Sequence, residues 1–256
     1  MEHSMAFYAS IAIFLVTYGL IVWDKYSRML VSLGGAVIMI GFGFVSQATA
    51  IKEDIDFNTL GLLVGMMLIV AITSKSGLFQ AGALWAAHVT KGSPWRLLFL
   101  LSVITAIGSA LFDCVTAVLL IAPVTLTLAD KLKVNAFPFL MTEILVSNVG
   151  GTGLLVGNPP NVMIGSATGL TFNDFFIYLA PVCAIATLLI IPILIFLYRR
   201  DLEPHPETKD AIMSISYQDA IEDPVLLKKS LFVLALTIGC FIETHCLGLD
   251  TATIAI

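Results

Sequence analysis

The chain has 256 residues, 58% of them hydrophobic and 12% charged, with a net charge of −5 and a mean hydropathy of +0.97. Soluble domains carry about 25% charged residues, so this composition excludes a soluble globular protein. Several apolar runs approach the roughly 20 residues that cross a bilayer, and the chain is therefore predicted to be an all-α polytopic membrane protein.

The first third of the chain predicts three membrane segments, at about residues 6–23, 29–45 and 59–73. A short loop with Lys25 and Arg28 separates the first two segments, and a mostly acidic loop, 47–58, precedes the third. The following stretch, 77–91, mixes large apolar residues with alanine and glycine, which favours an amphipathic helix at the membrane surface. A tilted, packed membrane helix is the alternative.

Two apolar arms, 95–112 and 117–129, flank the polar sequence Asp113-Cys114-Val115-Thr116. The arms have 18 and 13 residues, about 15 on average, which is fewer than the roughly 20 of a full crossing. The outer ends of the arms carry the basic residues Lys91, Arg96, Lys131 and Lys133. A polar centre between two basic ends predicts a re-entrant hairpin. A pair of full crossings would leave these basic residues on one side as well, so charge does not separate the two alternatives.

The stretch 147–161 reads Ser-Asn-Val-Gly-Gly-Thr-Gly-Leu-Leu-Val-Gly-Asn-Pro-Pro-Asn and lies between the apolar runs 137–146 and 162–168. Glycine and proline interrupt helices. The lipid core tolerates an interrupted backbone only where protein buries it or a polar cavity meets it. The stretch is therefore predicted to be the unwound centre of a discontinuous helix, a feature that forms ion and substrate sites in secondary transporters.

The last third predicts a helix at about 175–198, a charged, proline-rich loop at 199–224 and an apolar run at 226–247. Cytoplasmic loops carry an excess of lysine and arginine. An outside N-terminus, five crossings and the hairpin place the basic residues in the cytoplasm, except Lys52. We therefore expect a multi-pass protein of the cell membrane.

We divide the chain into a first transmembrane repeat, a cytoplasmic linker and the first helix of a second repeat, at residues 1–198, 199–224 and 225–256. Five crossings are an odd number, so a second repeat would run inverted, as in many transporters. We therefore expect the sequence to be part of a longer protein. Residues 1–256 alone are expected not to transport, because a second repeat would supply half of the site.

Asp113 is the leading candidate for chemistry, because a carboxylate at membrane depth is costly and usually functional. It can also act as the N-cap of the second arm, and the two roles are compatible. Cys114, through its backbone carbonyl, and Thr116 would help to surround a cation. For Na⁺, which prefers hard oxygen ligands, the expected ligands are Asp113, Thr116 and Asn148.

Asn158, followed by Pro159 and Pro160, predicts a helix start whose positive dipole end faces the membrane centre and attracts an anion. The same stretch supplies further candidate binding residues: Ser147, Asn148, Gly150, Gly151, Thr152, Gly157 and Asn161. Glycines and prolines that only permit a kink or close packing are the alternative.

Glu143 lies about one turn before Ser147 and is a candidate proton carrier, with a paired structural carboxylate as the alternative. The sequence contains no nucleophile–base pair, zinc-ligand spacing or phosphate-binding loop. An enzyme is therefore not expected, and a nucleic-acid partner is not expected either.

Two motifs carry a family resemblance. The first is Phe-Asp-Cys-Val-Thr-Ala-Val-Leu at 112–119, followed by Ala-Pro at 122–123. The second is Ser-Asn-Val-Gly-Gly-Thr at 147–152, followed by Gly-Asn-Pro-Pro-Asn at 157–161. Together they resemble the paired signatures of the ion transporter superfamily. The most similar branch contains arsenical-pump membrane proteins, D-type sodium/proton antiporters, citrate-transporter-like permeases and the melanosomal P protein.

The resemblance covers essentially the whole chain and implies an elevator-type secondary transporter, usually dimeric, with two inverted repeats. In such proteins the hairpin tips and the discontinuous helices hold the coupling cation and the substrate, which here correspond to 113–116 and 147–161. The chain departs from the branch at Cys114, where asparagine is common, and at Asn158, where aspartate is common. The second change removes a negative charge, which weakens cation binding and favours an anionic substrate.

The sequence therefore predicts a secondary active transporter for a small anion of the arsenite or carboxylate class, coupled to a Na⁺ or H⁺ gradient and needing no other cofactor. A sodium/proton antiporter is the alternative within the superfamily. A passive channel or a membrane scaffold is the alternative of another class. The expected partners are the small-molecule or ionic substrate, the lipid bilayer and a second copy in a homodimer.

Overall fold

The computed structural model describes residues 2–202, 223–243 and 251–255, and these residues form helices and no strands. Helices that are long and apolar enough to cross a membrane occur at Phe57–Ser74, Pro94–Leu111, Cys114–Leu132, Phe172–Leu197 and Pro224–Ile242. The predicted all-α polytopic membrane protein is therefore confirmed. The predicted linker at 199–224 lies mostly outside the described residues.

The chain forms two compact units, Met1–Phe57 and Asn58–Ile256, which we call unit 1 and unit 2. Unit 1 is a hairpin of α1 (Glu2–Val22) and α2 (Arg28–Gly41), followed by the short α3 (Gln47–Thr49) and a π-helical turn, η1 (Ala50–Asp54). The two long helices approach closely at Gly35, where a Cβ atom would lie 2.6 Å from Oγ1 of Thr17. Because α3 and η1 fall within 47–58, the loop predicted to be acidic contains a short helical segment.

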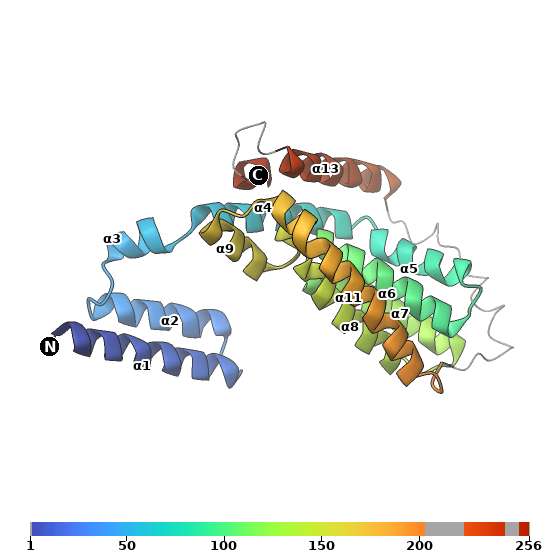
Figure 1. Cartoon of the computed structure of the whole chain (residues 1–256), viewed down its shortest axis with the longest axis horizontal. Coiled ribbons are helices and arrows are strands. Elements are labelled where there is room, and N and C mark those ends of the chain that lie inside the picture. Colours follow the sequence, from blue (N-terminus) through green and yellow to red (C-terminus); the bar gives the residue numbers. More distant parts are fainter. Residues whose placement is uncertain (1, 203–222, 244–250, 256) are drawn as a thin grey trace. The chain divides into compact units, whose positions relative to one another are not determined.

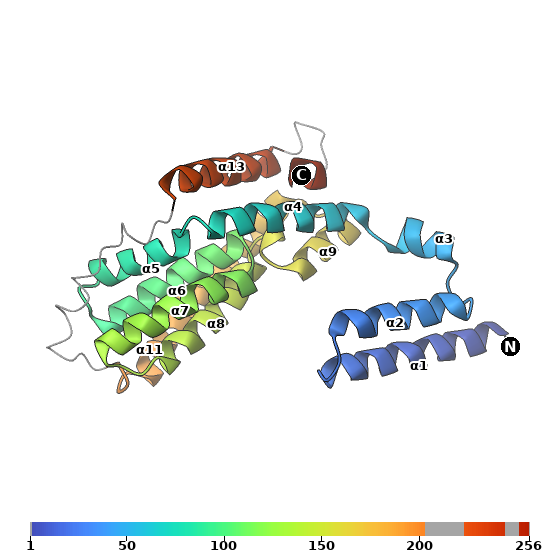
Figure 2. The same cartoon turned by 180° about the vertical axis from the view of Figure 1, so that it is seen from behind.

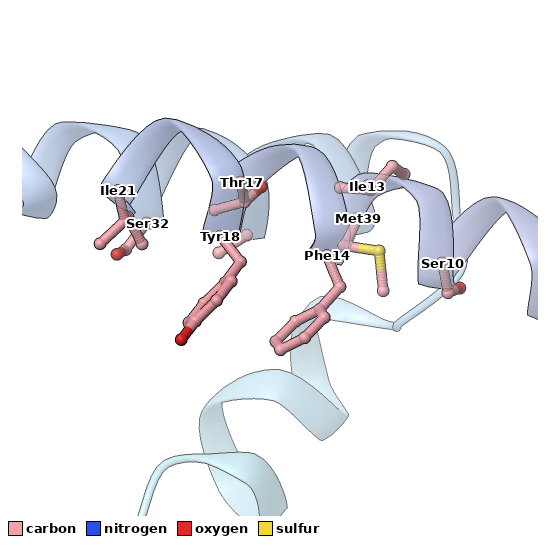
Figure 3. A pocket seen from close by; sticks show the side chains of 10 residues that line it. Ser10, Ile13, Phe14, Thr17, Tyr18, Ile21, Ser32 and Met39 are labelled. Atoms are coloured by element: carbon pink, nitrogen blue, oxygen red, sulfur yellow. The ribbon is translucent and has the colours of Figure 1, made fainter. Parts of the chain in front are cut away.

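A groove of about 300 Å³ lies along the α1–α2 hairpin (Figure 3). Phe14 and Tyr18, one turn apart on α1, project to the same side, and their stacked rings lie 6.2 Å apart. The groove is lined mostly by apolar residues, and its lining contains no charged side chain. Besides Tyr18, its hydroxyl groups belong to Ser10, Thr17 and Ser32. The groove therefore lacks the ligands of an ion site.

The centre of unit 2 is a bundle in which α6 (Pro94–Leu111), α7 (Cys114–Leu132), α8 (Phe137–Thr152) and α11 (Ala180–Leu197) lie side by side (Figures 1 and 2). Its core contains fully buried leucine, alanine and phenylalanine side chains from these helices, including Leu101, Leu128 and Phe139. A Cβ atom on Gly150 would lie within 3.0 Å of the Ala106 carbonyl oxygen. Glycine at this position therefore lets α6 and α8 pack backbone to backbone.

Two further helices of unit 2 precede this bundle, α4 (Phe57–Ser74) and α5 (Leu78–Val89). The 12 residues of α5 extend for about 18 Å, which is too short to cross a bilayer. One face of α5 is buried and contains Phe79, whose ring packs 5.2 Å from that of Phe112. Trp85 lies on the exposed face. The stretch predicted to be amphipathic is therefore a helix with one packed and one exposed face.

The first hairpin arm, α6, has 18 residues, as many as the predicted range 95–112, whereas the second, α7, has 19 against the 13 of the predicted range 117–129. Only Phe112 and Asp113 separate the two arms. The residues Cys114–Thr116, predicted to form a non-helical tip, are the first turn of α7. The reason is local, since Asp113 caps the helix and allows it to begin at the next residue. Arms of about 27–29 Å suit either a full crossing or a tilted hairpin, so the re-entrant hairpin stays a prediction.

The discontinuous helix is interrupted over fewer residues than predicted. Helix α8 continues to Thr152, a 3₁₀ turn, η2 (Leu155–Gly157), follows, and α9 (Pro159–Thr168) begins after Asn158. The break is therefore 153–158 rather than 147–161. Its apolar residues Leu154–Val156 are buried in a cluster with Leu62 and Met66 of α4, so protein and not lipid covers the interrupted backbone.

The last membrane helices begin at side-chain caps. Thr171 and Asp174 form a capping box that starts a continuous helix of α10 (Phe172–Asp174), the π-helical turn η3 (Phe175–Leu179) and α11, three residues before the predicted start. Asp223 caps α13 (Pro224–Ile242). Asn173 donates a hydrogen bond of 2.9 Å to the Ile242 carbonyl, which joins α13 to α10. The short α15 (Thr251–Ala255) contacts α4 at Gly65.

Basic residues collect at one end of the bundle. The Phe137 ring at the start of α8 lies 5.9 Å from the Tyr198 ring at the end of α11. This contact brings the start of α8 to the end of α11, so Lys133, Arg199 and Arg200 lie at the same end of the bundle. The far ends of α6 and α7 meet at Asp113, so the basic residues and the hairpin tip lie at opposite ends of α7.

Candidate functional site

Asp113 is the N-cap of α7, as the cap alternative predicted. Its backbone is extended, with φ −174° and ψ 159°. One carboxylate oxygen, Oδ1, accepts hydrogen bonds from the N–H groups of Val115 at 2.8 Å and Thr116 at 3.1 Å. The side chain is half-buried, and no described residue donates to its second oxygen, Oδ2. One oxygen therefore holds the helix, and the other is available to a ligand.

Cys114 and Thr116 belong to the first turn of α7. A carbonyl in the first turn of a helix accepts a hydrogen bond from the N–H four residues later, so the Cys114 carbonyl is directed along the helix. The N–H of Cys114 lies at the first helical position, where a helix leaves its N–H groups without an internal partner. The hairpin tip therefore presents a carboxylate oxygen and a helix N-terminus.

The polar residues at the end of α8 are helical, and their side chains bond to their own helix. Ser147 donates to the Ile144 carbonyl at 2.9 Å, Asn148 to the same carbonyl at 2.8 Å, and Thr152 to the Asn148 carbonyl at 2.8 Å. The prediction that 147–152 is unwound is therefore wrong. These local bonds, together with close packing at Gly150, keep the segment helical despite its glycines.

The hairpin tip and the helix break meet at Gly151. A Cβ atom on Gly151 would lie 2.7 Å from the Gly157 carbonyl oxygen, 2.9 Å from Oγ of Ser109 and 3.3 Å from Cβ of Cys114. A Cβ atom on Gly157 would lie 2.5 Å from the Gly151 carbonyl oxygen and 2.9 Å from that of Ala110. No larger residue fits at either position without displacing backbone, so the two glycines bring three helix ends together.

Asn161 holds the two halves of the broken helix together. Its buried side-chain amide donates to the carbonyls of Thr152 and Leu154, both at 2.9 Å, and to that of Gly151 at 3.5 Å. The last carbonyls of a helix have no partner within it, and this amide satisfies them. Asn161 was predicted as a binding residue, and the structure gives it a bracing role across the break.

Asn158 occupies the predicted N-cap position of α9, but its side chain makes no capping hydrogen bond. Pro159 and Pro160 have no N–H, and the N–H of Asn161 bonds to the Asn158 carbonyl at 3.0 Å. An anion at this helix start would therefore find the dipole but none of the first three N–H groups. The free Asn158 amide is the polar group that this helix start offers.

The structure separates some of the predicted binding residues. Ser147, Gly150 and Gly151 lie on the buried face of α8, whereas Asn148 is exposed and projects from a different face of the helix. Among the described residues, no group of three His, Cys, Asp or Glu side chains clusters as a metal site. A Na⁺ site at Asp113, Thr116 and Asn148 stays a prediction.

Glu143 is buried between α7 and α8, with 1% of its surface exposed. Its Oε1 accepts a hydrogen bond of 2.6 Å from the Thr125 hydroxyl of α7, and its Oε2 has no partner among the described residues. Glu143 and Ser147 are one helical turn apart and both buried, so they lie on the same face of α8. The Glu143 carboxylate therefore shares the helix face that leads to Gly151.

Sequence analysis missed Ser109 and Thr125. The Ser109 hydroxyl donates to the Ser147 carbonyl at 2.5 Å, which joins α6 to α8 beside the break. Ser109 belongs to a buried row on α6 with Ser102 and Thr105. Hydroxyl residues at intervals of three and four in an otherwise apolar segment mark one face of a helix, and this pattern was the available signal.

An apolar cavity of about 320 Å³ lies beside the break, between α6, α8 and α11. Gly150, Gly153 and Leu154 contribute to its lining, together with Cys183 and Thr187 of α11. It offers no charged group and is therefore unsuited to an anion. The cavity leaves open volume next to a backbone segment that is not held by helical hydrogen bonds.

The chain is similar to known membrane proteins. A family model described as citrate transporter, CitMHS, matches residues 18–256. The chain is 42% identical over 236 residues to a 46 kDa membrane protein of Mycobacterium leprae, covering 91% of this chain and 55% of that protein. It is 40% identical over 250 residues to an uncharacterized transporter of Mycobacterium tuberculosis, covering 96% of this chain and 58% of that protein.

A mammalian relative is more distant. The chain is 34% identical over 199 residues to the P protein of Mus musculus, covering 74% of this chain and 24% of the P protein. The chain thus spans little more than half the length of the mycobacterial relatives and about a quarter of the P protein. The match to the family model includes both the hairpin and the broken helix, since it extends over residues 18–256.

Proposed function

The chain belongs to the citrate transporter family of membrane transporters, and from this premise we propose that it forms part of a secondary active transporter for a small anion of the arsenite or carboxylate class. Transport is coupled to a Na⁺ or H⁺ gradient. The proposed site comprises the hairpin tip at Asp113 and the helix break at 153–158. The observation that carries this proposal is the meeting of Cys114, Gly151 and Gly157 inside an apolar bundle.

This arrangement supports a transport site because interrupted helices expose backbone dipoles and polar groups at membrane depth. The N-terminus of α7 carries a partial positive charge, and the ionised Asp113 carboxylate shares one negative charge between Oδ1 and Oδ2. A cation at Oδ2 would neutralise the carboxylate and leave a net positive environment for an anion. Cation and anion would then bind together, which is the requirement for coupled movement.

A sodium/proton antiporter is the second candidate. Two observations favour it: the free Oδ2 atom suits a cation, and the double proline of α9 removes the N–H groups that an anion would use. A passive channel would use the same polar groups without coupling. Dimer formation and a location in the cell membrane are further parts of the proposal, by analogy with the superfamily.

The test is flux through the purified, complete gene product in proteoliposomes with imposed Na⁺ or H⁺ gradients. Labelled citrate, other carboxylates and arsenite form the substrate panel, and internal Na⁺ and pH dyes detect cation exchange. Accumulation of an anion against its gradient supports the proposal. Cation exchange without any anion supports the antiporter, and flux that only dissipates gradients supports the channel.

The Asp113→Asn variant tests the site. Asparagine is as good an N-cap as aspartate, so α7 should remain folded while the negative charge is lost. We expect gradient-driven accumulation to fall to background, with unchanged expression and thermal stability. Asp130→Asn is the matched control, because Asp130 is an exposed residue at the other end of α7. Normal coupled uptake in Asp113→Asn would exclude Asp113 from the site.

A further inference from the structure

Glu143 stands apart from the site at the hairpin tip. It is the one charged side chain of α8, and it lies in the middle of the helix with 1% exposure. Within the described chain, the buried side-chain oxygens without a partner are its Oε2 and Oε1 of Gln80, and of these two groups only Glu143 can titrate. A buried titratable group with half of its hydrogen-bonding capacity unused requires a physical explanation.

The helices packed against α8 offer Glu143 no counter-charge. α6 has Arg96 in its first turn and no charged residue after it, and α7 has Asp130 and Lys131 in its last turn. These three side chains are exposed at the basic end of the bundle. α11 and η2 contain no charged residue, and the other titratable groups on these elements are the thiols of Cys114 and Cys183. Thr125 is thus the polar partner that reaches the carboxyl group.

An ionised carboxylate in such surroundings is unfavourable, because a single hydroxyl cannot replace its hydration. A protonated carboxyl group is neutral and keeps the bond from Thr125 to Oε1, with the proton on Oε2. The carboxyl group can therefore lose its proton only when a conformational change admits water to Oε2. This requirement links the protonation of Glu143 to the state of the bundle.

The position of Glu143 connects it to the tip. Glu143, Ser147 and Gly151 follow one another at intervals of four residues on the buried face of α8. Thr125 binds Glu143 from α7, the helix whose first turn is capped by Asp113, and Ser109 binds the Ser147 carbonyl from α6. Cross-helix hydrogen bonds therefore tie the face that carries Glu143 to both arms of the hairpin.

We propose that Glu143 is a proton-binding site of this transporter, separate from the cation and substrate site at Asp113, and that Thr125 positions its carboxyl group. In the occluded bundle the group is protonated. When the bundle opens, the Oε2–H bond breaks, the proton passes to water and a carboxylate remains; the reverse step takes one proton from water on the other side. No other bond changes. This inference rests on the proposed transport function.

Infrared difference spectroscopy of the reconstituted, complete protein tests the protonation directly and needs no substrate. A protonated carboxyl group in apolar surroundings gives a C=O stretching band that a carboxylate lacks. We expect such a band near neutral pH, its loss in Glu143→Gln, and its persistence in Glu243→Gln. Glu243 is the matched control because it is exposed at the end of α13.

The Thr125 variants keep the inference testable if Glu143→Gln fails to fold. Thr125→Val removes the hydroxyl and should shift the band to the frequency of a carboxyl group without a hydrogen bond. Thr125→Ser should restore the original frequency. A wild-type protein without the band, or a band that is unchanged in both Glu143→Gln and Thr125→Val, would overturn the inference.

Transport measurements then separate this inference from the proposed function. With the substrate found in the panel, Glu143→Gln should retain exchange of labelled for unlabelled substrate and lose accumulation driven by a pH gradient. Full pH-driven accumulation in Glu143→Gln would overturn the role in coupling. Absence of any flux in the wild-type protein would contradict the proposed function, whereas the infrared result would still decide whether Glu143 binds a proton.

Discussion

At the scale of single residues, the structure divides the polar side chains of the broken helix into two groups. Asn161 braces the break through three carbonyls, and Ser147 is buried against α6. Asn148 and Thr152 bond to their own helix and lie toward its surface. Polar character at membrane depth therefore does not identify a ligand by itself, because much of it satisfies the interrupted backbone.

This division gives a stability prediction for Asn161. Asn161→Ala would leave buried carbonyls at the break without a donor, which costs about 1–3 kcal/mol. We expect a lower midpoint of thermal unfolding in detergent micelles. Asn148→Ala is the matched control, since it loses one exposed bond within a helix turn and should leave the midpoint nearly unchanged. Equal midpoints for the two variants would contradict the bracing role.

At the scale of elements, the hairpin of α6 and α7 is the feature whose placement in the membrane matters most. Its arms are long enough to cross, yet its tip meets the helix break at Gly151. A break in the middle of a crossing would lie near the bilayer centre, and the tip that contacts it must lie at the same depth. The contact at Gly151 therefore favours a re-entrant hairpin, although α6 and α7 are each long enough to cross the membrane.

The depth of α7 is directly measurable. Val115, Leu119 and Leu126 are exposed along this helix, with 61%, 67% and 48% of their surfaces accessible. Spin labels at these positions should be deepest at Val115 and progressively shallower toward Leu126, as reported by collision with dissolved oxygen and with an aqueous paramagnetic reagent. The midpoint of α7 is Pro123. A spanning helix would therefore be shallow at Val115 and similarly deep at Leu119 and Leu126, and that profile would exclude a re-entrant hairpin.

At the scale of the whole molecule, charge and packing agree within unit 2. The ring contact between Phe137 and Tyr198 brings the loop of Lys133 and the pair Arg199–Arg200 to the same end of the bundle. The positive-inside rule independently predicted that these residues share the cytoplasmic side. The two arguments are independent, because one uses side-chain contacts and the other only the distribution of basic residues.

Cysteine labelling tests this topology. In a variant without native cysteines, Lys133→Cys and Arg200→Cys should react with a membrane-impermeant maleimide only in inside-out vesicles. Lys52→Cys should react only in right-side-out vesicles, because its loop is predicted to lie outside the cell. Labelling of Lys133→Cys and Arg200→Cys from opposite sides would contradict the structure, whereas inverted labelling of all three would contradict only the predicted orientation.

The sequence by itself determined the membrane class, the helix segments, the cap at Asp113 and the family, because hydropathy, capping chemistry and motifs are local properties. It predicted too wide a break, since the helicity of 147–152 depends on packing of Gly150 against Ala106. Only the tertiary structure decided that Asn161 donates hydrogen bonds across the break and that Ser109 and Thr125 donate hydrogen bonds to α8. It also decided that the hairpin tip meets the break at Gly151. These facts depend on contacts between residues distant in sequence, which the periodicity of one segment does not contain.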